Sequence, residues 1–166
     1  MRLYHGSNQL FRKPQLVKCR PFKDFGKGFY VTGRLIQAIM MAERTSRLFG
    51  GRPAVMTYDA DLDGTEGASL AIRRFITPDE AWARFVMANR RPSISANDHN
   101  RDCRYDYVVG PVANDDLALL FRQFERNMIS VETLVHEMQF KVLTIQHSFH
   151  TEKAIGLLKF VEARYV

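Results

Sequence analysis

Two glycine-containing motifs near the start of the chain constrain its fold and function more than any other feature. The first is Leu3-Tyr4-His5-Gly6-Ser7, and the second, from Asp24 to Thr32, reads Asp-Phe-Gly-Lys-Gly-Phe-Tyr-Val-Thr. Each places a polar or aromatic side chain on a strand-like run next to glycine, whose missing side chain lets a flat, phosphorylated ligand approach the backbone closely. Together the two motifs predict a dinucleotide pocket.

The composition is that of one ordinary globular domain. The chain has 166 residues, of which 46% are hydrophobic and 25% charged, and a chain of this length buries roughly 70% of the surface that its unfolded form exposes. No repeat, low-complexity tract or linker divides it, so we expect a single domain over residues 1–166. No uninterrupted apolar stretch approaches the roughly 18 residues that a membrane helix needs.

The two cysteines, Cys19 and Cys103, have neither the number nor the spacing of a disulfide framework or a metal site. We therefore expect reduced thiols, a cytoplasmic location and no bound metal. The chain also carries a net charge of +6, which suits a dinucleotide pyrophosphate and a nucleic acid equally well. The basic pairs are scattered along the chain, which is more typical of solvated faces than of a dedicated nucleic-acid groove.

Glycine, proline and capping residues divide the chain into short elements. We expect strands at 2–5, 28–32, 53–61, 70–75, 105–109 and 141–149, with an extended piece at 15–19. We expect helices at 35–48, 77–89, 115–126, 130–139 and 151–161, and a mobile surface loop at 91–102. Strands dominate both ends and helices fall between them, an order that favours an α+β architecture over a regular βαβ alternation.

Two of these helices carry specific predictions. In the helix at 35–48, Ile36, Ile39, Met40 and Leu48 supply an apolar stripe. In the helix at 77–89, Thr77 is the expected cap, followed by proline at the first helical position.

The two motifs resemble those of the ADP-ribosyltransferase superfamily, in the branch whose site reads His-Tyr-Glu. In that branch His-Gly-Ser or His-Gly-Thr opens the fold, and a Phe-Gly-x-Gly-aromatic-Tyr segment follows. The stretch from Tyr105 to Asp116 and the late Gln-x-x-Phe-x-Thr, from Gln146 to Thr151, are similar to a poorly characterised bacterial subgroup. The resemblance covers most of the chain. It implies a split β-sandwich of two small facing sheets with peripheral helices, and NAD as the substrate in the cleft between the sheets.

The resemblance implies a site around both motifs. His5 would hold the ribose next to the nicotinamide, and the Gly6 backbone would pair with the carboxamide. Tyr30 would stack on the ring. Without the resemblance, His5 is interpreted as a structural hydrogen-bonding residue and Tyr30 as a core aromatic. Both residues are also compatible with the ligand, because imidazole can donate to a ribose hydroxyl. The predicted NAD-binding residues are His5, Gly6, Ser7, Gly26, Gly28 and Tyr30.

The sequence departs from the family pattern at the third site position. Gln146 aligns where a glutamate is typical, and Thr144 stands where arginine-directed enzymes carry a second acid. An amide can accept a hydrogen bond from a ribose hydroxyl, but it cannot balance charge or act as a base. Glu152 is the nearest acid, and it fits either a favourable charge at a helix start or a carboxylate that reaches back into the cleft. Gln146 and Glu152 are therefore the candidate catalytic residues.

Three functions follow from these observations. The first is transfer of ADP-ribose from NAD to a protein or nucleic-acid acceptor. For this function the resemblance also implies a toxin-like setting and a neutralising partner protein. The second is a catalytically weak module that binds NAD or ADP-ribose, which the amide at position 146 favours. The third is a basic nucleic-acid-binding domain in which the motifs are structural.

Overall fold

The computed structural model describes residues 1–62, 69–91, 93–94, 96–112, 115–139 and 144–166. Its strands are β1 (Arg2–Ser7), β2 (Phe29–Val31), β3 (Ala54–Ala60), β4 (Ile72–Arg74), β5 (Tyr107–Pro111), β6 (Ile145–Phe149) and β7 (Leu158–Tyr165). Its α-helices are α1 (Leu35–Phe49), α3 (Glu80–Arg90), α4 (Asp115–Glu125), α5 (Val131–Gln139) and α6 (Glu152–Ile155), with a short 3-10 helix η1 (Leu16–Lys18). Residues 141–143 of the strand expected at 141–149 lie outside the described residues.

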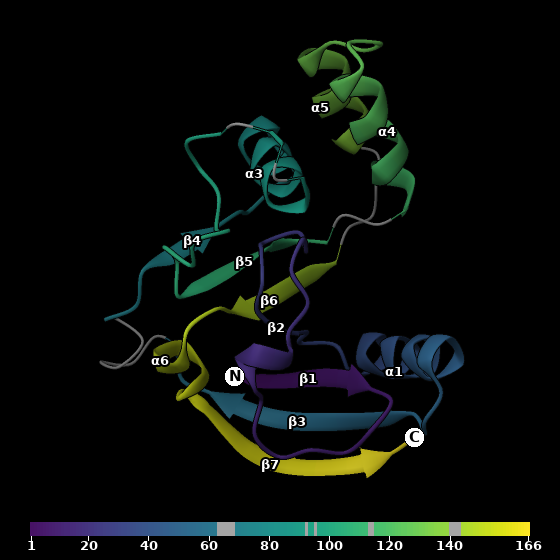
Figure 1. The fold of residues 1–166 in the computed structure, drawn as a ribbon, viewed down its shortest axis with the longest axis vertical. Helices are drawn as coiled ribbons and strands as arrows, with labels where there is room; N and C mark the ends of the chain where they lie inside the picture. Colours follow the sequence, from purple (N-terminus) through teal and green to yellow (C-terminus); the bar gives the residue numbers. More distant parts are fainter. Residues whose placement is uncertain (63–68, 92, 95, 113–114, 140–143) are drawn as a thin grey trace.

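The strands form two small sheets, as the α+β prediction requires. The first is antiparallel with the order β1-β3-β7, and the second has the order β2-β6-β5-β4, in which only the β4–β5 pair is parallel. Among the described residues, one isolated bridge connects the sheets: the Tyr4 N–H donates to the Thr32 carbonyl oxygen at 2.8 Å, and the Thr32 N–H donates to the Tyr4 carbonyl oxygen at 2.9 Å. The two motifs at the start of the chain therefore meet at the junction of the sheets (Figure 1).

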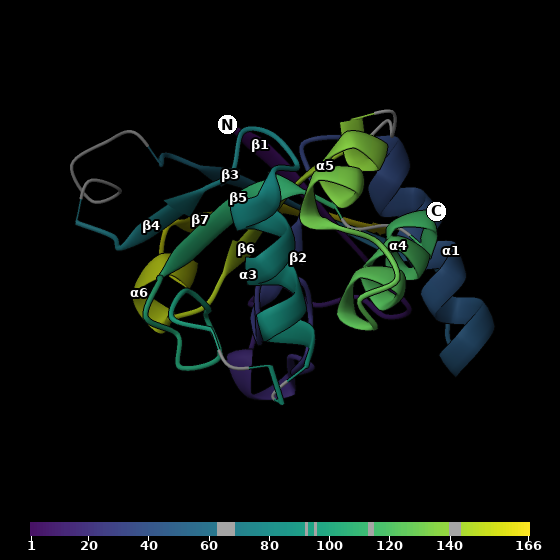
Figure 2. The same cartoon turned by 90° about the horizontal axis from the view of Figure 1, so that it is seen from above.

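Three apolar clusters hold these layers together. The first joins side chains of both sheets, among them Leu3, Met56 and Phe149. The second packs α3, α4 and α5 against the opposite face of the second sheet, around Trp82 and Val108. Figure 2 shows α3 over that sheet from above. The third, smaller cluster lies between α1 and the first sheet.

Helix α1 buries small residues and exposes large ones. Ala38 and Ala42 are buried against the first sheet, and Ile39 is partly buried beside them. Ile36, Met40 and Leu48, three of the four predicted stripe residues, are more than half exposed. The predicted stripe was therefore wrong, because α1 approaches the sheet so closely that only small side chains fit between them.

Three further local predictions were also wrong. Residues 15–19 contain the 3-10 helix η1 rather than an extended piece. Asp79, not Thr77, caps α3, and its carboxylate accepts from the Trp82 N–H at 2.8 Å. The helix expected at 151–161 ends at Ile155, since Leu158–Tyr165 forms the edge strand β7 beside β3.

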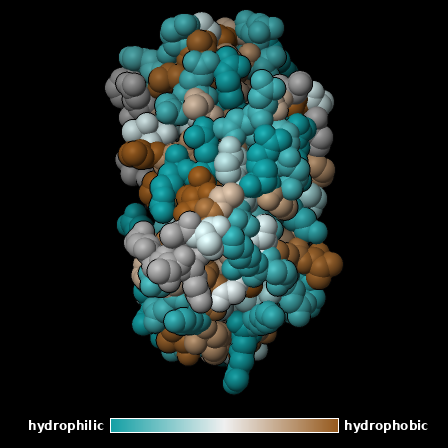
Figure 3. Space-filling view, turned by 90° about the vertical axis from the view of Figure 1, so that its left-hand side faces the viewer, coloured by the Kyte–Doolittle hydropathy of each residue, from teal (hydrophilic) through white to brown (hydrophobic). Residues whose placement is uncertain are grey.

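The outside of the molecule is largely polar on the face drawn in Figure 3, where hydrophobic side chains are scattered among hydrophilic ones. In the described part of the chain, no helix is both long enough and apolar enough to cross a membrane.

Candidate functional site

The imidazole of His5 interrupts the pairing of β1 with β2. Beyond the Tyr4–Thr32 bridge, a regular antiparallel ladder would bring Gly6 opposite Tyr30. Instead, His5 Nδ1 lies 2.7 Å from the Tyr30 carbonyl oxygen. A carbonyl oxygen can only accept, so Nδ1 carries the proton and Nε2 does not. The two strands separate at this point.

The separation leaves the backbone of Gly6 unpaired. Backbone groups alternate in direction along a strand, so those of Gly6 point the same way as those of Tyr4, away from β3 and toward β2. Within the described residues, neither the N–H nor the C=O of Gly6 has a hydrogen-bond partner on that side. One donor and one acceptor therefore stand side by side at the opening between β1 and β2.

His5 is a neutral acceptor at neutral pH. Burial lowers its pKa to about 4, although its bond to Tyr30 acts in the opposite direction. The ring packs on Phe29 with 4.4 Å between centroids. No described residue bonds to Nε2, which is not enclosed. The expectation that His5 donates to a ribose hydroxyl is corrected here, because its one N–H is already used and the free nitrogen can only accept.

Tyr30 lies on the other face of β2 from Phe29, as strand alternation predicts. Its hydroxyl donates to the Gly26 carbonyl oxygen at 2.7 Å and accepts from the Phe25 N–H at 3.0 Å. Burial, with the nearby Asp24 charge, raises the pKa of the phenol well above its usual value. The hydroxyl is thus fixed beneath the glycine loop, and Tyr30 as a whole is partly buried.

Gly26 and Gly28 allow that loop to pack on the rest of the protein. Gly26 has a φ of +92°, and a Cβ there would lie 2.6 Å from the Asn100 carbonyl oxygen. A Cβ on Gly28 would lie 2.5 Å from His150 Nδ1. The structure gives both glycines this packing role. Asn100 itself is buried and its N–H donates to Asn89 Oδ1 at 2.8 Å, which anchors the end of the predicted surface loop.

Gln146 is on the same face of the second sheet as Tyr30, because Tyr30 pairs with Ser148 two residues along β6. Its Nε2 donates to Asp24 Oδ2 at 3.0 Å. Asp24 is buried and also forms an ion pair with Arg90 at 2.7 Å. Gln146 is only partly buried, and its Oε1 has no partner among the described residues.

Glu152 is not brought to this region. It lies exposed in the first turn of α6, where Thr151 caps the helix by accepting from the Ala154 N–H. Ser7 ends β1 and is partly buried. The structure therefore brings the His5 ring and the Gly6 backbone to the backbone of Tyr30. The Tyr30 side chain and Gln146 lie on the face of the second sheet opposite Phe29, on which the His5 ring packs.

The family model described as "Protein of unknown function (DUF3990)" matches residues 1–160. The chain belongs to the DUF3990 family. No curated protein and no solved structure matches it.

Asp24 and Arg90 are the residues of this DUF3990 site that the sequence did not reveal. Asp24 stands in the second motif but without an assigned role, and Arg90 stands in a basic pair that reads as a solvated surface. Asp24 and Gln146 are 122 residues apart in sequence. No local signal links the two, since only the fold brings them together.

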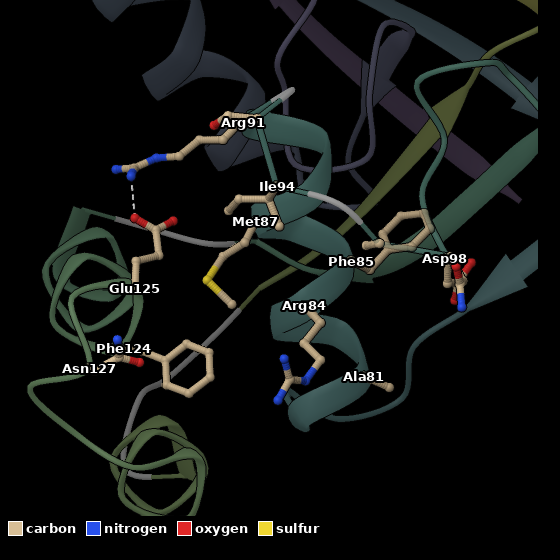
Figure 4. Close-up of a pocket in the computed structure, with 13 residues that line it drawn as sticks. Ala81, Arg84, Phe85, Met87, Arg91, Ile94, Asp98, Phe124, Glu125 and Asn127 are labelled. Atoms are coloured by element: carbon tan, nitrogen blue, oxygen red, sulfur yellow. Dashed lines mark ion pairs between the residues drawn. The ribbon is translucent and has the colours of Figure 1, made fainter.

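A separate hollow in the described part of the DUF3990 chain lies elsewhere. It has a volume of about 650 Å³ and opens between α3, residues 93–94 and 96–98, and the end of α4 (Figure 4). The arginines that line it are already paired, Arg84 with Glu80 and Arg91 with Glu125. Their charge is balanced and the hollow contains none of the predicted site residues, so we assign the candidate site to the opening between β1 and β2. Among the described residues, no group of three or more His, Cys, Asp or Glu side chains could hold a metal ion.

Proposed function

We propose that the protein binds NAD at the opening between β1 and β2 and transfers ADP-ribose from it, within an ADP-ribosyltransferase-like split β-sandwich. The observation that carries this proposal is the unpaired backbone of Gly6. It lies beside the Tyr30 carbonyl oxygen, which is hydrogen-bonded to the His5 ring. A primary carboxamide has one acceptor oxygen and an NH₂ donor group. The Gly6 N–H and C=O are the matching donor and acceptor for the carboxamide of nicotinamide.

The neighbouring side chains suit the rest of this half of NAD. The ring of Tyr30 offers an electron-rich face to the cationic pyridinium. The Nε2 of His5 can accept a hydrogen bond from a ribose hydroxyl, because this nitrogen is unprotonated at neutral pH. Both side chains are held by hydrogen bonds before a ligand arrives, which lowers the ordering cost of binding.

The reaction is a substitution at C1′ of the nicotinamide ribose. The bond between C1′ and the ring nitrogen breaks, and both electrons leave with nicotinamide. A lone pair of the acceptor then forms the new bond to C1′, while the proton of the acceptor passes to water. The acceptor is a protein side chain, a nucleic acid or, in hydrolysis, water. Positive charge develops on the ribose during this step, and Gln146 Oε1 supplies a partial negative charge toward it.

A catalytically weak binding module is the second candidate, and Gln146 is the observation that favours it. A neutral amide stabilises the developing charge less than a carboxylate does. Binding of NAD without release of nicotinamide would identify this second function.

The test measures NAD binding by calorimetry and nicotinamide release, with and without cell extract. We expect binding and release by the parent protein, and loss of both in His5→Ala and Tyr30→Ala. His136→Ala and Tyr165→Ala are matched controls, because these two side chains are exposed on α5 and β7. We expect the controls and Glu152→Ala to match the parent. No heat with NAD, or salt-dependent nucleic-acid binding by a protein indifferent to NAD, would contradict the proposal.

A further inference from the structure

The buried carboxylate of Asp24 determines which end of the Gln146 amide is free. A carboxylate at neutral pH accepts hydrogen bonds and donates none. The Gln146 atom that lies 3.0 Å from Asp24 Oδ2 must therefore be Nε2, the donor of the amide. The other atom of the amide, Oε1, is not used in the bond to Asp24 and is available to a ligand.

Asp24 is itself held rigidly enough to impose this orientation. Its side chain is 11% exposed, and Oδ1 accepts from Arg90 Nε at 2.9 Å and from Arg90 Nη2 at 2.7 Å. Oδ2 accepts from Gln146 Nε2 at 3.0 Å. The loop that carries Asp24 is fixed in turn by the Tyr30 hydroxyl, which bonds to Gly26 and Phe25. Tyr30, Asp24 and Gln146 thus form one connected unit.

We propose that Asp24 is a positioning residue that keeps the oxygen of Gln146, rather than its NH₂ group, directed toward the ribose of bound NAD. This inference rests on the proposed function. The polarity of the amide matters because an oxygen stabilises positive charge developing at C1′, whereas an NH₂ group opposes it. A glutamate at position 146 would not need a positioning residue, because both of its carboxylate oxygens carry negative charge. In this protein, however, it would lie beside the Asp24 carboxylate, and the two like charges would repel. Asp24 and Gln146 therefore suit each other as a pair.

The substitution Asp24→Asn tests this orientation without removing the partner of Arg90. The introduced amide would keep one oxygen, which can still accept from Arg90, and would gain an NH₂ group where Oδ2 now lies. Gln146 must then turn its own amide so that Oε1 accepts from this new NH₂ group, which presents Nε2 to the ligand. We expect nicotinamide release at saturating NAD to fall roughly 10-fold to 100-fold. The Kd for NAD should change by less than about threefold, since a ribose hydroxyl can also accept.

The double substitution D24N/Q146E exchanges the positions of the carboxylate and the amide. It is the decisive experiment. The introduced asparagine would donate to the introduced glutamate and still accept from Arg90, so every bond of the pair is kept. We expect nicotinamide release to return to the parent rate or above it. Asp59→Asn is the matched control, because Asp59 and its ion-pair partner Arg2 are both exposed on the first sheet. Its release rate should equal that of the parent.

The outcomes separate this inference from the proposed function. Thermal unfolding of each variant verifies the fold, and the NMR signals of the Gln146 side-chain NH₂ report its bond to Asp24 without NAD. A parent that binds NAD, with D24N equal to it, overturns the inference alone. A folded D24N/Q146E that is as impaired as D24N also overturns it, because a loss that the exchange does not repair is not due to amide orientation. A parent that neither binds nor cleaves NAD overturns the proposed function, and the inference with it.

Discussion

The backbone of Gly6 lies directly against the backbone of Ala38 in α1: a Cβ on Gly6 would be 2.0 Å from the Ala38 carbonyl oxygen. It would also lie 2.7 Å from the Ala42 backbone nitrogen. Neither atom can move without displacing the helix. The glycine of the first motif is therefore required by helix packing, in addition to any approach of a ligand to its backbone.

Gly6→Ala should destabilise the protein strongly. The added methyl group forces α1 away from the first sheet, and overpacking of this kind typically costs about 1–3 kcal/mol and sometimes more. Urea unfolding measures the change in unfolding free energy. Gly33→Ala is the control, because a Cβ there meets nothing within 4 Å. Equal stability of the two variants would show that α1 does not pack on Gly6 as described.

Much of the fold follows from local sequence signals, and the exceptions have physical causes. The strands around Gly6 and Tyr30 and the helix ended by Gly50 were predicted and are confirmed, because glycine and period-two patterns are local. Residues 158–161 were predicted as the end of a helix, but they belong to the strand Leu158–Tyr165, whose backbone groups pair with β3, far away in sequence. Tertiary pairing decided that element, and no local window contains its partner.

Stability should fall as the pH falls from about 6.5 to about 4, because of three histidines. Burial lowers the pKa of His5, His147 and His150 to about 4 each. Between that value and the unfolded-state pKa, the unfolded chain binds protons that the folded protein does not. Each ring therefore reduces the unfolding free energy by up to about 1.4 kcal/mol per pH unit in this window.

Urea unfolding at pH 7.5, 6.0 and 5.0 measures this loss. His147→Gln removes one of the three buried rings and should make this pH dependence weaker. A stability that is constant across this range would show that the three rings bind protons at the same pH in the folded protein as in the unfolded chain.

Tyr30→Phe should loosen the glycine loop while it keeps the aromatic ring. The change removes the hydroxyl that accepts from the Phe25 N–H, and Phe25 is fully buried. An unpaired buried donor costs about 1–3 kcal/mol. Hydrogen exchange should show faster exchange of the Phe25 amide, together with a lower unfolding free energy. Tyr165→Phe, at the exposed end of β7, should show neither effect.

Asp79→Ala should destabilise α3, and Thr77→Ala should not. Asp79 accepts from the Trp82 N–H at the start of the helix, whereas the expected cap Thr77 lies outside it. Loss of an aspartate cap typically costs about 0.5–2 kcal/mol. Thermal unfolding of the two variants compares them directly, and a larger loss in Thr77→Ala would restore the cap that the sequence favoured.

The candidate site was predictable only where its residues belong to continuous motifs. His5 and Tyr30 were found because each stands beside glycine in a recognisable run. The tautomer of His5 could not be foreseen, since it depends on the Tyr30 carbonyl oxygen that the fold places 2.7 Å away. The role of Asp24 could not be predicted either, because it depends on Gln146, which lies 122 residues away in sequence.

The exposed side of α1 should tolerate polar substitution, and its buried side should reject enlargement. Met40 is 62% exposed and Leu48 is 63% exposed, so M40Q and L48Q remove little buried area, and we expect each to change the unfolding free energy by less than about 0.5 kcal/mol. Ala42 is fully buried against the first sheet, and Ala42→Leu should cost about 1–3 kcal/mol, because the added atoms have no space. Urea unfolding of the three variants tests this inverted arrangement. A large loss in M40Q with a small one in Ala42→Leu would mean that α1 is rotated about its axis, with the sequence-predicted stripe facing the sheet after all.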